Sequence, residues 1–267
     1  MIPKPETDEL LVDLQDHVLT ITFNRPDRLN AISGPMLNAL SVVLQAANID
    51  RDVRCIILTG NGRGFCAGLD LKDQMSGDGL GVGQRGYQLF DLHNSPPIVI
   101  NRMDKPIVCA LNGAAAGYGM DLALGCDIRI ASEYAKMGAV FAKRGVLPES
   151  GGCWYLPRLL GWAKAAEVAF LGDVLDAQQS LQVGLVNKVV PHDDLMTEAN
   201  KVARQIASNA PLSVQTTKRM MRLGQDETFE AAVDHIYLQL LPLFQSQDFK
   251  EGLSAFAERR DPNFQGR

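Results

Sequence analysis

The sequence predicts an α/β protein, because short strands and amphipathic helices alternate along most of its 267 residues. Two apolar runs near residues 10–23 have the length and polar flanks of strands, and an apolar stripe with helical spacing follows residue 33. The same rhythm returns at 55–59 and over 107–141, whereas the chain beyond residue 191 carries helical patterns alone. Interleaved elements of this kind are typical of sheets covered by helices.

The N-terminal part is predicted to form two strands and a capped helix. The strands cover residues 10–14 and 18–23 and are joined by a polar turn at Gln15-Asp16. Ser33 directly precedes a Gly-Pro pair, where its hydroxyl can cap the first turn of a helix. That helix would bury an apolar stripe formed by Leu37, Leu40, Val43, Leu44 and Ala47.

Further strands and helices follow. The run at 55–59 is continuously apolar and ends at Gly60, as expected of a strand buried on both faces. Other strands are predicted at 107–111, near 128–131 and near 137–141, with a helix beginning after Gly117; candidate helices of the last part lie near 193–209, 212–223, 227–246 and 248–259. We therefore divide the chain into a core, residues 1–205, and a helical C-terminal region, residues 206–267, that packs on the core or on another subunit.

Composition excludes several classes of protein. With 46% hydrophobic and 21% charged residues, the chain can bury a large core. Its net charge of −5 and the absence of any run of five basic residues argue against a nucleic-acid surface. No apolar stretch approaches the roughly 20 residues that a membrane span needs, and the first residues lack the apolar segment of a signal peptide.

The five cysteines and four histidines are scattered along the chain. No two cysteines have CxxC spacing and no histidine adjoins a cysteine, so the pattern of a zinc site is missing. Scattered thiols are typical of proteins in a reducing compartment. We therefore expect no metal site, no structural disulfide and a cytoplasmic location.

A glycine motif at residues 81–86, Gly-Val-Gly-Gln-Arg-Gly, matches the dinucleotide-binding fingerprint letter by letter. The fingerprint requires a strand directly before it and an acidic residue on a later strand. Here a polar, glycine-filled stretch precedes the motif, and two prolines follow at 96–97. We therefore interpret residues 73–86 as a surface loop and not as a nucleotide site.

Two other glycine-rich segments carry a more specific pattern. In residues 59–72 an apolar strand runs into small residues, and Asp70 could open a helix. Small residues let a ligand approach the main chain, and a helix start leaves N–H groups free to bind an anion. The alternative is a tight turn in which the glycines serve backbone geometry alone.

Residues 111–127 repeat this arrangement of a strand, small residues and a helix start. Asp121 lies about one turn inside the expected helix, on the same face as the N–H of Tyr118. One loop could therefore supply both a donor to an oxyanion and a carboxylate beside it. The alternative is that Asp121 only favours the positive end of the helix dipole.

Together these segments resemble the enoyl-CoA hydratase/isomerase (crotonase) superfamily. The resemblance rests on Asn-Arg-Pro-Asp-Arg-Leu-Asn-Ala-Ile at 24–32, Phe-Cys-Ala-Gly-Leu-Asp-Leu-Lys at 65–72 and Asn-Gly-Ala-Ala-Ala-Gly-Tyr-Gly at 112–119. The segment 248–260 is similar to the closing helix of that family. The resemblance implies a spiral of ββα turns and a helical C-terminal trimerisation region, with trimers often paired into hexamers.

The resemblance also implies roles for individual residues. The N–H groups of Leu69 and Tyr118 would form an oxyanion hole for an acyl-coenzyme A thioester. The residues expected to contact coenzyme A are Arg28, Leu29, Ala67 and Lys72, together with Phe256 and Arg259 on a helix that often comes from a neighbouring subunit. Arginine and lysine suit the phosphates of that group because of their charge. No cofactor is expected beyond the coenzyme A moiety of the substrate.

The carboxylates depart from the hydratase pattern of the family. Hydratases carry glutamates at the positions of Asp121 and Phe141, and phenylalanine cannot transfer a proton. Glu149 falls where related double-bond isomerases, and some other branches of the family, carry their catalytic acid, in a turn expected to open a helix. Glu149 could instead serve only as an acid at that helix start.

We therefore expect Glu149 and Asp121 to move protons on an unsaturated acyl-CoA, giving double-bond isomerisation or hydration. Other chemistry of the family, such as C–C hydrolysis or dehalogenation, uses the same oxyanion hole. A catalytically silent acyl-CoA-binding scaffold is an alternative of another class, which the two carboxylates argue against. A serine hydrolase is disfavoured, because Ser150 does not lie in a GxSxG elbow.

Overall fold

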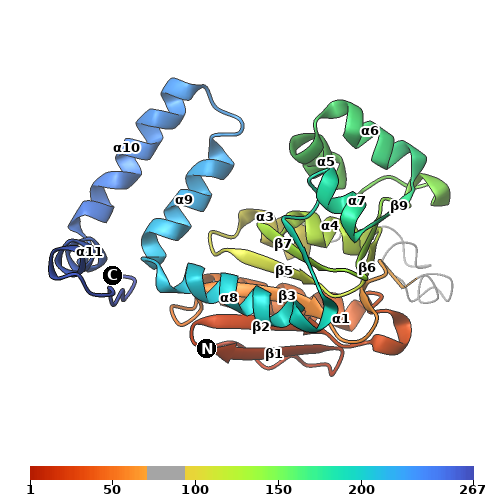
Figure 1. The fold of residues 1–267 in the computed structure, drawn as a ribbon, viewed down its shortest axis with the longest axis horizontal. Helices are drawn as coiled ribbons and strands as arrows, with labels where there is room; N and C mark the ends of the chain where they lie inside the picture. The colour runs from red at the N-terminus through yellow and green to blue at the C-terminus, as the bar shows by residue number, and fades with distance from the viewer. Residues whose placement is uncertain (71–93) are drawn as a thin grey trace.

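A computed structural model describes residues 1–70 and 94–267, and these residues contain two sheets (Figure 1). The larger sheet has the order β1-β2-β3-β5-β7-β10, in which β1 and β2 pair antiparallel and the other neighbours are parallel. Its strands are β1 (Leu10–Gln15), β2 (Val18–Phe23), β3 (Cys55–Gly60), β5 (Ile107–Leu111), β7 (Ile128–Ser132) and β10 (Lys188–Val190). The predictions for Lys72, for the loop at 73–86 and for a helix opened by Asp70 fall outside the described residues.

The smaller sheet consists of β4 (Gly64–Cys66), β6 (Ala114–Ala116), β8 (Lys136–Gly138) and β9 (Val174–Asp176), in that order. β4, β6 and β8 follow β3, β5 and β7 along the chain, so each turn of the chain gives one strand to each sheet. This arrangement confirms the predicted α/β spiral. The strand predicted near 137–141 is wrong in extent: it ends at Gly138, and Phe141 begins the short 3-10 turn η3 (Ala142–Arg144).

Helices cover both faces of the larger sheet, because its central strands are apolar on both sides. Ile56 and Leu58 of β3 pack into a core with α1 and α4, whereas Cys55 and Ile57 face α8. Small residues on α8 line that second face at helical spacing, namely Ala199, Ala203 and Ala207. The helices of the core are α1 (Gly34–Ile49), α3 (Pro96–Arg102), α4 (Tyr118–Gly125), α5 (Gly152–Leu160), α6 (Trp162–Leu171), α7 (Ala177–Gln182) and α8 (Leu195–Ser208).

The local signals read from the N-terminal sequence are confirmed. The hydroxyl of Ser33 accepts a hydrogen bond from the N–H of Met36 and so caps α1. Asp16 and His17 both have positive φ and form the tight turn between β1 and β2, one residue later than predicted, because Gln15 belongs to β1. Lys105 is buried at the other end of α1, where its ammonium group donates to the carbonyl oxygens of Ala47 and Asp50. These contacts fix both ends of the helix that supports the N-terminal half of the spiral.

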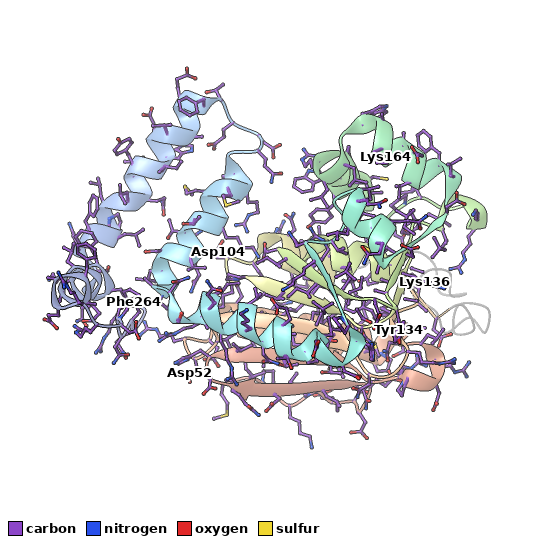
Figure 2. The ribbon with its side chains drawn as sticks, viewed as in Figure 1. Asp52, Asp104, Tyr134, Lys136, Lys164 and Phe264 are labelled. Carbon is purple, nitrogen blue, oxygen red and sulfur yellow. The ribbon has the colours of Figure 1, made fainter. Side chains whose placement is uncertain are left out.

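The C-terminal helices leave the core as an arm (Figure 1), formed by α9 (Pro211–Leu223), α10 (Phe229–Gln245) and α11 (Gln247–Glu258). Two ion pairs hold α9 to the core. Nη2 of Arg222 lies 2.9 Å from Oδ1 of Asp104, and the guanidinium of Arg219 binds the other oxygen of the same carboxylate. Figure 2 shows Asp104 beside this helix. No residue of α10 is buried. Its apolar face is therefore uncovered in a single chain. Among the described residues, no helix is long and apolar enough to cross a membrane.

Replacing Gly113 tests how closely consecutive turns of the spiral pack. A Cβ atom at Gly113 would overlap the carbonyl oxygen of Arg63 and lie 2.7 Å from its carbonyl carbon. We expect Gly113→Ala to destabilise the fold by about 2 kcal/mol or more, because backbone atoms must move. Gly34→Ala is the control, since nothing lies within 4 Å of its added Cβ. Urea unfolding should show a lower midpoint for the first variant only; equal midpoints would contradict the close packing.

Candidate active site

The main chain of Leu69 is held by the segment around Ile32. The N–H of Ile32 donates to the carbonyl oxygen of Gly68 at 2.8 Å, and the N–H of Asp70 donates to the carbonyl oxygen of Ile32 at 3.0 Å. In a trans peptide the C=O and N–H point in opposite directions, so the N–H of Leu69 points away from Ile32. No acceptor for it lies among the described residues.

The N–H of Tyr118 lies close to this loop. Tyr118 is the first residue of α4, so its N–H has no partner within the helix. A Cβ atom at Gly68 would lie 2.9 Å from the carbonyl oxygen of Ala116 and 3.6 Å from the nitrogen of Tyr118. Gly119 touches the other side of the loop, where an added Cβ would overlap the carbonyl oxygen of Cys66. The structure thus brings the two expected donors together.

Glycine at these positions permits the close contact between the two loops. Gly68 has φ +101°, and its Cα faces the start of α4. Gly117 has φ +54°, a conformation that side chains rarely adopt, directly before the Tyr118 donor. The positive φ values and the close contact show that these glycines are required by the backbone geometry.

Asp121 is buried beside the start of α5. Its side chain is 1% exposed, and its Oδ2 accepts a hydrogen bond of 3.1 Å from the N–H of Ser150. Oδ1 has no hydrogen-bond partner among the described residues. Burial raises the pKa of Asp121 from its ordinary 3.8 to about 7, although the N–H groups of Gly152 and Ser150 partly oppose this rise. Asp121 can therefore hold a proton near neutral pH, which a helix-dipole role does not require.

Glu149 lies next to Asp121, in the turn that opens α5. The turn passes through Gly151, with φ +111°, and the helix begins at Gly152, as predicted. Glu149 is exposed, and its charge contributes to raising the pKa of both Asp121 and Tyr118. The two carboxylates thus occupy neighbouring positions with different solvation, one buried and one open to solvent.

Phe141 contributes an apolar side chain to the same region. It is 4% exposed, and its Cε1 lies 3.9 Å from the position of a Cβ at Gly117. At the position where the hydratase pattern has a second glutamate, this chain therefore has an aromatic ring. The ring packs against Gly117, the residue before Tyr118.

Three of the expected coenzyme A contacts lie together. The carbonyl oxygen of Leu29 accepts a hydrogen bond of 3.0 Å from the N–H of Ala67, and Arg28 lies beside it at the exposed end of the 3-10 turn η1 (Pro26–Arg28). Sequence reasoning gave no role to Asn30, which is fully buried. Its amide donates to the carbonyl oxygens of Asn61 and Gly64 and so ties the two segments together. Buried contacts between distant residues leave no local pattern in the sequence.

Phe256 and Arg259 do not reach this site within one chain. Phe256 is 86% exposed on α11, and Arg259 ends that helix with φ +56°. The arm that carries them lies at the opposite end of the molecule from α5 and α6 (Figure 1).

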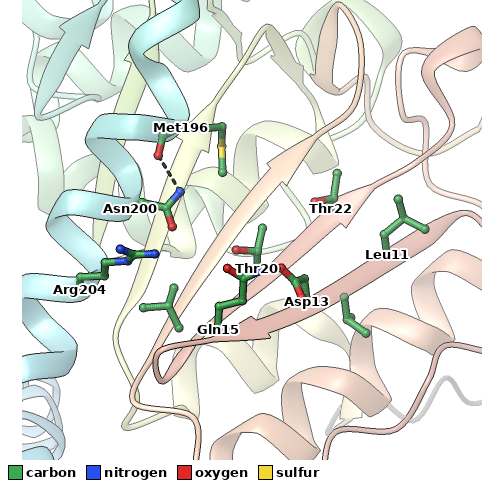
Figure 3. Close-up of a pocket in the computed structure, with 10 residues that line it drawn as sticks. Leu11, Asp13, Gln15, Thr20, Thr22, Met196, Asn200 and Arg204 are labelled. Carbon is green, nitrogen blue, oxygen red and sulfur yellow. Dashed lines mark hydrogen bonds between the residues drawn. The ribbon is translucent and has the colours of Figure 1, made fainter.

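A separate groove of about 410 Å³ lies on the other face of the larger sheet. Figure 3 shows it between β1, β2 and α8, with Asp13, Thr20 and Arg204 among its lining residues. It contains none of the candidate site residues. The part of the chain that the structure describes also contains no group of three or more His, Cys, Asp or Glu side chains arranged to hold a metal ion.

Comparisons with known proteins give one consistent picture. The sequence model of the enoyl-CoA hydratase/isomerase family matches residues 13–267. A 1,2-epoxyphenylacetyl-CoA isomerase of Escherichia coli is 36% identical over 97% of this chain and 98% of its own length. A 2,3-dehydroadipyl-CoA hydratase of the same organism is 34% identical over 97% and 99%. The crystal structure of an enoyl-CoA hydratase from Bacillus anthracis superposes with a TM-score of 0.90 at 32% identity, covering 97% of this chain and 100% of that one.

The raised pKa of Asp121 predicts a dependence of stability on pH. Between about pH 4 and pH 7 the folded chain keeps a proton that the unfolded chain releases, so the free energy of unfolding contributed by this group falls as pH rises. Over the whole window the loss is on the order of 4 kcal/mol. Asp121→Asn keeps the shape and does not titrate, so its stability should fall less than that of the wild type across this window. Urea unfolding from pH 4 to pH 8 measures this, and parallel curves for the two proteins would contradict it.

Proposed function

Because the chain belongs to the enoyl-CoA hydratase/isomerase family, whose members act on acyl-CoA thioesters, we propose that it shifts or hydrates a double bond of an unsaturated acyl-CoA. The observation that carries this proposal is the convergence of two main-chain donors and two carboxylates. The N–H groups of Leu69 and Tyr118 lack protein acceptors among the described residues. Asp121 lies one turn into the helix that Tyr118 opens, and its carboxylate accepts a hydrogen bond from the N–H of Ser150, the residue after Glu149.

The two N–H groups would hold the thioester oxygen as it becomes an enolate. Donors fixed by the backbone do not reorganise while charge develops, and losing one typically costs on the order of 3 kcal/mol in the barrier. Leu69 is fixed by the Ile32 contact, and Tyr118 by its place at the start of α4. Their side chains affect the shape of the pocket and not the donors.

The carboxylates would then divide the proton transfers. Glu149, which is exposed, is our principal acid/base, taking a proton from carbon and returning it elsewhere. Asp121, whose burial raises its pKa to about 7, is its partner and can donate a hydrogen bond or orient water. Two carboxylates in different environments are a general way to obtain an acid and a base in one site.

The apolar ring of Phe141 favours isomerisation over hydration. It stands where the hydratase pattern has a glutamate, so one of the two groups that would position water is missing. The relatives carry names of both kinds: one is named a 1,2-epoxyphenylacetyl-CoA isomerase and another a 2,3-dehydroadipyl-CoA hydratase.

We further propose that the C-terminal region, residues 206–267, assembles the protein into a homotrimer or a dimer of trimers. The uncovered apolar face of α10 supports this, because large exposed patches mark contact surfaces. In such an assembly Phe256 and Arg259 would cover coenzyme A bound by Arg28, Leu29, Ala67 and Lys72 of a neighbouring subunit. We place the protein in the cytoplasm and assign it no cofactor beyond the coenzyme A moiety of its substrate.

Other functions predict different behaviour. C–C hydrolysis or dehalogenation would use the same donors on a different acyl group, and a silent scaffold would bind thioesters without turnover. A panel of saturated, 2-enoyl, 3-enoyl, dienoyl, β-dicarbonyl and halogenated acyl-CoA thioesters, with identification of products, separates these possibilities.

Substitution of the carboxylates tests the assigned roles. Glu149→Gln should lower kcat by about 10²–10⁴-fold while thioester binding persists, because the amide keeps the shape and loses the proton. Asp121→Asn should lower it less if isomerisation is the reaction, whereas hydration needs both groups. Glu167→Gln on α6, an exposed carboxylate paired with Lys164, is the control and should behave as wild type. Deuterium from solvent should enter the α or γ carbon during isomerisation. Full activity in Glu149→Gln would falsify its role.

The assembly is tested on α10. Leu241 is 57% exposed, and Leu241→Lys should shift a trimer or hexamer towards monomer by placing a charge in the contact. Ile49→Lys, at an equally apolar position that is 82% exposed at the end of α1, should leave the assembly unchanged. Sedimentation at micromolar concentrations measures both variants. A wild-type protein that is monomeric throughout would contradict the proposal.

A further inference from the structure

Arg25 connects three parts of the chain that surround the Leu69 donor. Its side chain is 15% exposed. Nε lies 3.0 Å from a carboxylate oxygen of Glu9, and one terminal nitrogen lies 3.1 Å from a carboxylate oxygen of Asp70. The same nitrogen donates to the carbonyl oxygen of Ala31 at 2.6 Å. Glu9 in turn accepts a hydrogen bond from the hydroxyl of Ser33, the cap of α1.

The bond to Ala31 begins a series of peptide groups that ends at the Leu69 N–H. The carbonyl of Ala31 and the N–H of Ile32 belong to one peptide group, and that N–H donates to the carbonyl oxygen of Gly68. The carbonyl of Gly68 and the N–H of Leu69 belong to the next. A cation at one end of such a series polarises each bond in the same direction, strengthening each by roughly 10–30%.

The ion pair with Asp70 holds the other side of Leu69. The Asp70 carboxylate is 7% exposed, and the N–H of Asp70 donates to the carbonyl oxygen of Ile32. Arg25 thus fixes the residue after Leu69 through its side chain, and the peptide before Leu69 through Ala31 and Ile32. Both contacts resist rotation of the peptide that carries the donor.

We propose that Arg25 is a positioning residue for the oxyanion hole, which orients and polarises the Leu69 N–H through two peptide groups in series and through Asp70. The inference rests on the proposed role of that N–H in holding the thioester oxygen. Arg25 does not touch the substrate. It acts from behind the loop, on the side of Leu69 opposite to the donor.

The test is the carbonyl stretching frequency of a bound thioester, which reports how strongly the oxyanion hole polarises it. Butanoyl-CoA labelled with ¹³C at the thioester carbon serves as an unreactive probe for difference infrared spectroscopy on the full-length protein. In the wild type the carbonyl band should lie lower than in free butanoyl-CoA. In Arg25→Met it should move back towards the free value, and kcat for the substrate found with the thioester panel should fall by about tenfold to a hundredfold with little change in KM.

Two further variants separate positioning from general stability. Arg25→Lys keeps a charge but cannot reach Glu9, Asp70 and Ala31 together, so it should give an intermediate band position. Arg222→Met removes a similar half-buried arginine, which pairs with Asp104 and donates to two carbonyl oxygens, and should leave the band at its wild-type position. If Arg25→Met does not fold, Glu9→Gln loosens Arg25 more gently and should shift the band in the same direction.

The possible outcomes are distinct. A wild-type band that is not lowered would remove the oxyanion hole, and with it both the proposed function and this inference. If the wild-type band is lowered and the band of Arg25→Met lies at the same position, the inference is overturned and the proposed function stands. The same holds for Glu9→Gln if Arg25→Met does not fold.

Discussion

The contact between two glycine-containing loops is the constraint on which the rest of the site depends. Each loop follows a strand of the smaller sheet, β4 or β6, and the loops meet where Gly68 faces the start of α4 and Gly119 faces Cys66. Side chains at these positions would overlap backbone atoms. Because the contact is formed by main chain on both sides, the two N–H groups are placed by the fold itself and not by flexible side chains.

The fold therefore places the main-chain donors, whereas individual side chains determine the chemistry that follows. The donors suit any reaction that develops charge on a thioester oxygen. The outcome would then depend on the proton-transfer groups near that oxygen, which under the proposed function are Asp121 of α4 and Glu149 in the turn before α5, whereas Phe141 supplies none. A single substitution at such a position can change the reaction without disturbing the donors, which agrees with the different reactions named among the relatives.

The sequence predicts the longer helices and strands because each is long enough to show the hydrophobic spacing of its type. The strand at 107–111 and the helices of the C-terminal arm agree with the structure to within a few residues. The three-residue strands β4, β6 and β9 are too short to show alternation, and they exist because neighbouring turns of the spiral bring them together. Motif resemblance predicts the donor positions and the role of Glu149, whereas the contacts of Asn30 and Arg25 join residues that are distant in the sequence and arise only in the folded chain.

The arm poses a complementary constraint, because it contacts the core at α9 and at the tail after α11, where Arg54 donates to the carbonyl oxygen of Phe264. Ion pairs to Asp104 hold α9, while α10 exposes an apolar face that a single chain leaves in water. The ion pairs fix the direction of the arm. The apolar face of α10 can then become buried only against another molecule. Since Phe256 and Arg259 stand far from the carboxylates of their own chain, completion of the coenzyme A site would then depend on assembly. Catalysis and oligomerisation would be linked through one element.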